Sequence, residues 1–264
     1  MRHQKRLWKI VVCLGTLAST LTIASVGQSA DPPFCLNKPS PSQSFLEAVY
    51  DALGPQDCER WPHLTPIRPD NPTLIWQQDQ VLMVTWAPTC TENSPPAALS
   101  CLGEGATYRV PDGDFYALWV TAAPDVSAFI QRERVYNPNF SPETLVSRLE
   151  QYLGLKPQGR DRTFVEIWVH PNDLLRPCLD EDPTDTQCEL WSWASLDPTS
   201  PFTLALGSGP FRDRYPFTGL GYTYDWGNPR TDVGASEFVV RHGATVMVHR
   251  KVSTQAYGEI PLSP

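Results

Sequence analysis

The 264 residues include 29 Asp and Glu against 21 Lys and Arg, so the chain has a formal net charge of −8 at pH 7. Phosphate groups repel such a chain, which argues against nucleic acid or an anionic membrane surface as a partner. The length is sufficient to bury a full hydrophobic core as one domain.

The first 30 residues have the pattern of a secretion signal. Basic residues at Arg2, Lys5, Arg6 and Lys9 precede an apolar run over 10–23, which is short for a bilayer span, and small residues follow. Without this segment 17 Lys and Arg remain against 29 Asp and Glu, a net charge of about −12. We expect an extracytoplasmic protein, secreted or periplasmic, with no membrane insertion after cleavage; an uncleaved anchor is the alternative.

Seven cysteines become six when segment 1–30 is removed, and an even number in an exported chain predicts disulfides. Their spacing favours local bridges over the many other pairings. No Cys-x-x-Cys occurs and no His lies near a cysteine pair, so zinc is not expected and we assign no metal ligands. The three predicted bridges are Cys35–Cys58, Cys90–Cys101 and Cys178–Cys188.

Residues 31–106 are rich in proline, and we predict an N-terminal extension that contains one helix and one β-hairpin. Apolar side chains recur at helical spacing from Phe45 to Leu53, and Gly54 is suited to end that helix. Two runs of strand composition, 74–76 and 81–86, flank a polar QQDQ turn.

Residues 107–250 are predicted to form the core. Short apolar runs bounded by turn residues indicate strands, and helical spacing of apolar side chains indicates two helices. This order predicts a single disulfide-stabilised α+β domain over 31–264, with a mixed or antiparallel β core and two or three helices. The expected strands are 108–110, 115–121 and 163–169, the helices run from Pro124 to about Arg134 and from Pro142 to Gly154, and a last hairpin joins 237–240 to 245–249 around Gly243.

The stretch 215–248 combines aromatic residues, glycines and a single strand acid, Glu237, more densely than the rest of the chain. Glu237 begins an apolar strand just after a Gly-Ala hinge. A carboxylate at a strand mouth beside flexible backbone is well placed for catalysis or for binding a sugar hydroxyl. An ordinary solvated acid at a strand end is the alternative interpretation.

The sequence EFVVRHGATVMV, which begins at Glu237, is similar to the last hairpin of the ADP-ribosyltransferase fold, in which the catalytic Glu opens a strand. Residues 119–129 resemble the Ser/Thr strand of that fold and its following helix. Residues 164–171 resemble the next strand, and residues 108–110 resemble the first, Arg-bearing strand. The resemblance spans about residues 108–248 and implies an ADP-ribosyltransferase-like fold.

The same resemblance implies an NAD-directed enzyme and a set of site residues. Glu237 would stabilise the oxocarbenium-like ribose as the catalytic residue, and Arg109 would hold the diphosphate. Thr121 keeps the Ser/Thr position of the family in the cofactor-binding site. Tyr222 or Tyr224 would stack on nicotinamide.

Two further alternatives remain open. Ala235 stands where protein-modifying members carry Glu or Gln, so the resemblance implies NAD glycohydrolysis or modification of a small target, and equally a degenerate, inactive member. The aromatic residues of 215–226, with Asp225 and Asn228, also suit a non-catalytic extracytoplasmic module that binds a glycan or a protein. Asp225 with Glu237 would form a glycosidase pair only at a suitable carboxyl separation.

Overall fold

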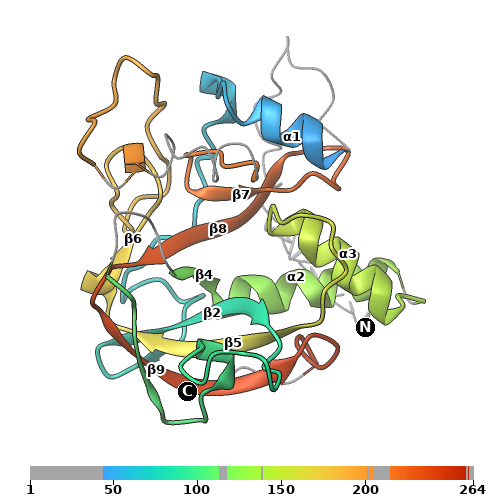
Figure 1. The fold of residues 1–264 in the computed structure, drawn as a ribbon. Helices are drawn as coiled ribbons and strands as arrows, with labels where there is room; N and C mark the ends of the chain where they lie inside the picture. Colours follow the sequence, from blue (N-terminus) through green and yellow to red (C-terminus); the bar gives the residue numbers. More distant parts are fainter. Residues whose placement is uncertain are drawn as a thin grey trace, which may run out of the picture. The chain divides into compact units, whose positions relative to one another are not determined.

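One antiparallel sheet organises the protein, as the computed structural model shows (Figure 1). The structure describes residues 44–112, 118–137, 139–200, 202–204, 215–259 and 261. The predicted signal over 1–30 and Cys35 lie outside these residues, which belong to one compact unit, Pro32–Pro264.

Seven strands follow one another across the sheet in the order β3-β9-β5-β2-β4-β8-β6, and two short strands add to it, β1 beside β2 and β7 beside β8. Together with the helices this is an α+β fold, as predicted. The strands are β1 (Trp76–Gln77), β2 (Gln80–Pro88), β3 (Thr107–Arg109), β4 (Leu118–Ala122), β5 (Arg162–Val169), β6 (Leu174–Leu175), β7 (Tyr222–Tyr224), β8 (Val233–Val240) and β9 (Thr245–Ser253). The helices are α1 (Phe45–Asp51), α2 (Ala123–Tyr136) and α3 (Pro142–Tyr152), with 3-10 turns η1 (Asp57–Glu59), η2 (Leu99–Cys101) and η3 (Pro171–Asp173).

The central strands are buried on both faces, which explains their nearly continuous apolar sequences. Successive side chains of a strand point to opposite faces. In β2, Val81 and Met83 belong to one hydrophobic cluster, whereas Leu82, Val84 and Trp86 belong to a second one. A third cluster, formed around Trp191 and Phe217, includes Val239 of β8 and Trp119 of β4. The second and third clusters cover the same face of the sheet, because Trp119 alternates with Val120, which faces the first cluster.

Helices α2 and α3 cover the second cluster, and both were predicted. Helix α2 starts directly after β4 with a proline in its first turn, and the Ser141 side chain accepts the backbone N–H of Thr144 to begin α3. The two helices meet where Phe129 stacks on Tyr152, with ring centroids 3.6 Å apart. Gly154, with φ of +63°, ends the second helix.

The predicted hairpin of 237–240 and 245–249 is wrong, although both strands exist. β8 pairs with β4, β6 and β7, whereas β9 pairs with β5 and β3, and the two strands diverge from a shared corner in Figure 1. Other segments hold that corner: Arg241 N–H donates to Asp173, and Gly243 N–H donates to the Val110 carbonyl. The glycine sets a local turn, but burial against different neighbours decides the pairing.

The part of the predicted N-terminal extension that the structure describes, residues 44–106, contributes to the sheet, because β2 lies between β5 and β4 in its middle. Long-range pairing with β5 over eight residue pairs places it there.

Two of the predicted disulfides, Cys90–Cys101 and Cys178–Cys188, are formed as expected from their spacing. Cys58 is also disulfide-bonded, while its predicted partner Cys35 lies outside the described residues. Disulfides are typical of oxidising compartments. In the described ranges, no helix has the length and apolar character needed to cross a bilayer.

Candidate functional site

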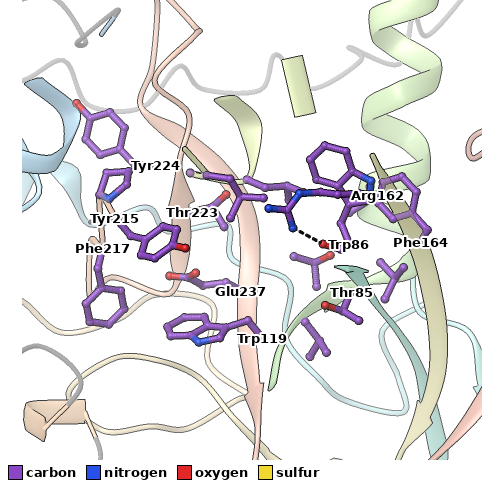
Figure 2. A pocket seen from close by; sticks show the side chains of 18 residues that line it. Thr85, Trp86, Trp119, Arg162, Phe164, Tyr215, Phe217, Thr223, Tyr224 and Glu237 are labelled. Carbon is purple, nitrogen blue, oxygen red and sulfur yellow. Dashed lines mark hydrogen bonds between the residues drawn. The ribbon is translucent and has the colours of Figure 1, made fainter. Parts of the chain in front are cut away.

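A cavity of about 390 Å³ opens on the sheet face that carries the second and third hydrophobic clusters (Figure 2). It lies where the part of the face covered by α2 and α3 ends and the part covered by residues 215–224 begins. Its volume is within the range of small-molecule sites. The lining residues are Val84, Thr85, Trp86, Trp119, Val120, Thr121, Val126, Leu153, Gly154, Leu155, Arg162, Phe164, Tyr215, Pro216, Phe217, Thr223, Tyr224 and Glu237.

The sheet register brings Glu237 into the cavity. Glu237 of β8 pairs directly with Thr121 of β4, and Thr121 pairs with Val84 of β2, so all three side chains lie on one face. The Glu237 N–H donates to the Gly221 carbonyl at 3.0 Å, which fixes the strand against residues 215–224. Glu237 therefore lies in the middle of a strand, not at the exposed strand mouth that the sequence indicated.

The Glu237 carboxyl is buried, and among the described residues the charge of Arg176 compensates that burial only in part. Its residue is 7% exposed, and no side-chain hydrogen bond joins it to any residue that the structure describes. Burial raises the pKa of Glu237 to about 8, against a smaller lowering by Arg176. Arg176 is committed elsewhere, since its Nη2 donates to the carbonyls of Thr65, Pro183 and Asp185. A strongly perturbed carboxyl in a cavity is a mark of a functional site.

Aromatic side chains form walls at both ends of the cavity, one beside the Glu237 carboxyl and the other around Arg162. Trp119 and Phe217 meet edge to face with centroids 5.8 Å apart, while Trp86 and Phe164 stack at 5.8 Å. Tyr215 is 37% exposed at the rim, and in Figure 2 its hydroxyl end points toward Glu237. These walls suit a flat or cationic group beside a carboxyl.

Arg162 is the cation among the lining residues, as Glu237 is the acid. Its Nη1 donates to the Trp86 carbonyl at 3.1 Å, and its guanidinium carbon lies 5.2 Å from the Trp86 ring centroid. Its Nε is buried without a hydrogen-bond partner. Burial lowers the pKa of Arg162, and Glu150 only partly offsets this.

The structure brings three of the sequence-predicted site residues together and leaves two apart. Thr121, Tyr224 and Glu237 line the cavity. Tyr222 does not, because its ring is buried and its hydroxyl donates to the Glu59 carbonyl at 2.9 Å.

Arg109 also lies away from the cavity, contrary to its assigned role. It belongs to β3, which four strands separate from β8 in the order of the sheet. Its side chain is 62% exposed, pairs with Asp112 at 3.1 Å and donates to the Gly243 carbonyl at 2.6 Å. β3 pairs with β9 at the edge of the sheet, and no local pattern in the sequence indicates this pairing.

Tyr224 lines the cavity with a side chain that is already engaged. Its ring is 1% exposed, and its hydroxyl donates to the Asp51 carboxylate at 2.6 Å. Tyr224 therefore acts as a wall, with little freedom to stack on a ligand.

Asp225 does not join Glu237 in the site. Arg148 holds both of its carboxylate oxygens, at 2.7 and 2.6 Å. It is absent from the cavity lining, so this geometry does not support a two-carboxylate glycosidase site.

One group of acids has the geometry of a cation site. Asp51, Glu59 and Asp232 each place a carboxylate oxygen within 4.8 Å of the other two. Each also takes part in other interactions: Tyr224 donates to Asp51, and the Gln56 N–H donates to Glu59. The cluster is explained by these contacts.

Sequence reasoning missed Arg162 and Trp119 as cavity residues. Trp119 lies within the predicted strand 115–121, where an aromatic side chain is ordinary strand composition, and Arg162 lies one residue before the predicted strand 163–169. A signal did exist for Arg162: at alternate positions it shares one face of β5 with Phe164 and Glu166, so two charged side chains lie on a face that also carries an aromatic ring.

Comparisons with models of protein families, with curated proteins and with solved structures found no match. The ADP-ribosyltransferase resemblance stays a prediction, and the function has to be argued from the site itself.

Proposed function

We propose that the cavity is the active site of an ADP-ribosyltransferase-like enzyme that cleaves the bond between nicotinamide and ribose in NAD. The observation that carries the proposal is the Glu237 carboxyl, buried beside aromatic rings without a hydrogen-bond partner in the described parts of the chain. Leaving a buried carboxyl unpaired costs stability, which is tolerated where a ligand supplies the missing interaction.

The charge of nicotinamide fits this environment. Burial keeps Glu237 of the free protein mostly protonated near neutral pH, since its pKa is about 8. The nicotinamide ring of NAD carries a positive charge, and a nearby cation favours the ionised carboxyl. Aromatic faces such as Trp119 attract the same cation. Binding therefore makes Glu237 release its proton to solvent and become the carboxylate that the reaction requires.

The chemistry then follows the positive charge. The glycosidic bond breaks, its electron pair stays on the nicotinamide nitrogen, and the charge passes to the ribose as an oxocarbenium-like centre. The Glu237 carboxylate stabilises this centre in a site of low dielectric constant. Water adds to the ribose carbon and releases a proton, which gives ADP-ribose and neutral nicotinamide.

Two threonines near Glu237 differ in what they offer a substrate. The Thr223 hydroxyl is committed, since it donates to the Tyr152 carbonyl at 2.6 Å and accepts from the Ala235 N–H at 2.8 Å. The Thr121 hydroxyl, paired in register with Glu237, makes no hydrogen bond to any described residue. It is free to bind a ribose hydroxyl or the nicotinamide amide.

Hydrolysis is favoured over protein modification. Ala235 is 1% exposed and packs within the second hydrophobic cluster, so this position offers no polar group to orient a protein nucleophile. A small acceptor such as water fits the enclosed carboxyl better.

The test is nicotinamide release from NAD by the purified, oxidised protein and by its Glu237→Gln variant. We expect release by the wild type and a loss of about 100-fold or more in the variant. A melting temperature of the variant that equals or exceeds that of the wild type would show that its fold is intact. Release that is equal in both proteins, or no release together with no NAD-induced thermal shift, would contradict the proposal.

The non-catalytic alternative is separated in the same experiment. A sugar ring also stacks on aromatic walls, and Trp119 would report it as a change in tryptophan fluorescence. Glycan binding that is unaffected by Glu237→Gln, with no nicotinamide release, would point to the binding module.

A further inference from the structure

Arg162 differs in its partners from three other arginines of the described chain that are partly or fully buried. Arg148 is paired with Asp225 and Glu133, and Arg250 is paired with Glu166. Arg176 donates to several carbonyls. Arg148 and Arg250 therefore have carboxylates that offset their loss of water. Arg176 has carbonyl acceptors, although its Nε also lacks a partner among the described residues and burial lowers its pKa to about 10.

Among the described residues Arg162 has a single hydrogen-bond acceptor. The Trp86 carbonyl binds Nη1, and no carboxylate of the described residues lies within ion-pair distance. Its Nε is buried without a partner. A partly buried guanidinium whose loss of water is offset only in part, here by the charge of Glu150, is destabilising unless a ligand provides a further counter-charge.

The position of Arg162 directs it to the ligand. Arg162, Phe164 and Glu166 alternate along β5 and so share one face, and Glu166 pairs with Val84 of β2 on that face. Since Val84 pairs with Thr121, Arg162 and Glu237 belong to the same face, three strands apart. In Figure 2 the guanidinium reaches from β5 toward the middle of the cavity.

We propose that Arg162 binds a phosphate of the ligand, so that the cavity selects a nucleotide over a nucleoside or a free sugar. One end of the cavity then takes a cationic ring beside Glu237, and the other takes a phosphate beside Arg162. The choice of nicotinamide for the ring rests on the proposed function. The phosphate end rests on Arg162 alone, because guanidinium and phosphate form paired, charge-assisted hydrogen bonds.

The test measures equilibrium binding of nicotinamide mononucleotide and nicotinamide riboside, which differ by one phosphate. Both are titrated into Glu237→Gln, which prevents turnover, and into the same protein carrying Arg162→Met. We expect the mononucleotide to bind about tenfold or more tightly than the riboside when Arg162 is present. The preference should disappear with Arg162→Met, while the affinity for the riboside stays the same.

Arg160→Met is the matched control. Arg160 is exposed, lies two residues from Arg162 and does not line the cavity, so its substitution removes the same charge outside the site. It should leave the preference intact. The phosphate site would be overturned if the preference survives Arg162→Met or is lost equally with Arg160→Met. It would also be overturned if neither compound binds detectably.

The pair AMP and adenosine separates failure of this inference from failure of the proposed function. These compounds carry a neutral ring and the same difference of one phosphate. An Arg162-dependent preference for AMP without nicotinamide release would keep the phosphate site and reject NAD cleavage. Nicotinamide release without an Arg162-dependent preference for nicotinamide mononucleotide or AMP would keep NAD cleavage and reject the phosphate site.

Discussion

Thr121 on β4 lies directly opposite Glu237 on β8, so a hydroxyl and a carboxyl, neither of them hydrogen-bonded to a described side chain, lie side by side on the face of the cavity. Neither group is required by the sheet, whose backbone bonds form without them. The neighbouring Thr223 hydroxyl, by contrast, links a helix to the sheet. Structural and uncommitted polar groups on this face should therefore respond differently to substitution.

Thr121→Val should mainly lower the rate of nicotinamide release, whereas Thr223→Val should mainly lower stability. Thr121→Val removes a hydroxyl with no partner in the described chain, so we expect unchanged or slightly higher stability and about tenfold slower nicotinamide release. Thr223→Val leaves the Tyr152 carbonyl and the Ala235 N–H unpaired, which should cost roughly 1–3 kcal/mol. Urea unfolding and initial rates measure the two effects. A large stability loss in Thr121→Val would argue for a structural hydroxyl.

The stability of the protein should depend on pH through Glu237. Its pKa in the folded protein is about 8, above the ordinary value of 4.5, because burial disfavours the carboxylate. Below both values the carboxyl is protonated whether the chain is folded or unfolded. As pH rises between them only the unfolded chain ionises freely, so the free energy of unfolding falls.

Glu237→Gln removes this dependence and leaves the other titrating groups in place. The difference in free energy of unfolding between the variant and the wild type should grow in favour of the variant by on the order of 3 kcal/mol from about pH 5 to about pH 8. Urea unfolding at both pH values measures the difference. Wild-type and variant stabilities that change in parallel would show that Glu237 titrates normally in the folded protein.

The two described disulfides should differ in their effect on the site. Cys188 lies beside Gly221, whose carbonyl accepts the Glu237 N–H, while Cys90 and Cys101 line no part of the cavity. Replacing Cys178 and Cys188 by Ser should lower both stability, by about 2–4 kcal/mol, and nicotinamide release. Replacing Cys90 and Cys101 should lower stability and spare the activity of the folded fraction. Thermal unfolding and rates at a temperature where both variants are folded make the comparison.

Gly221 supports the site through its backbone. Its φ is +75°, and a Cβ there would lie 2.7 Å from Cys188 Sγ and 2.8 Å from Arg176 Cδ. Gly221→Ala should therefore destabilise the protein by more than about 2 kcal/mol.

Gly105 provides the control for that substitution. Its φ is +76°, and no atom lies within 4 Å of the position that a Cβ would take. Gly105→Ala therefore carries only the backbone strain of about 1 kcal/mol. Equal losses in denaturant unfolding would mean that the contacts around Gly221 adapt to the added methyl group.

Local signals in the sequence determined the elements. Ser141 and Gly154 mark the ends of α3 through backbone capping, and the helices and central strands lie close to where apolar spacing placed them. Cysteines ten and eleven residues apart form the two described bridges, because short separations bring thiols together at low entropic cost. The α+β class follows from these elements alone.

Only the tertiary structure decided which strands pair and which charges meet. β8 and β9 are joined by a short turn and still bury against different neighbours, so the predicted hairpin fails. For the same reason Arg109 lies on an edge strand, while Arg162, far from Glu237 in the sequence, shares its cavity. Strand order depends on the burial of whole faces against distant segments, and a sequence pattern shows only which face of a strand is apolar.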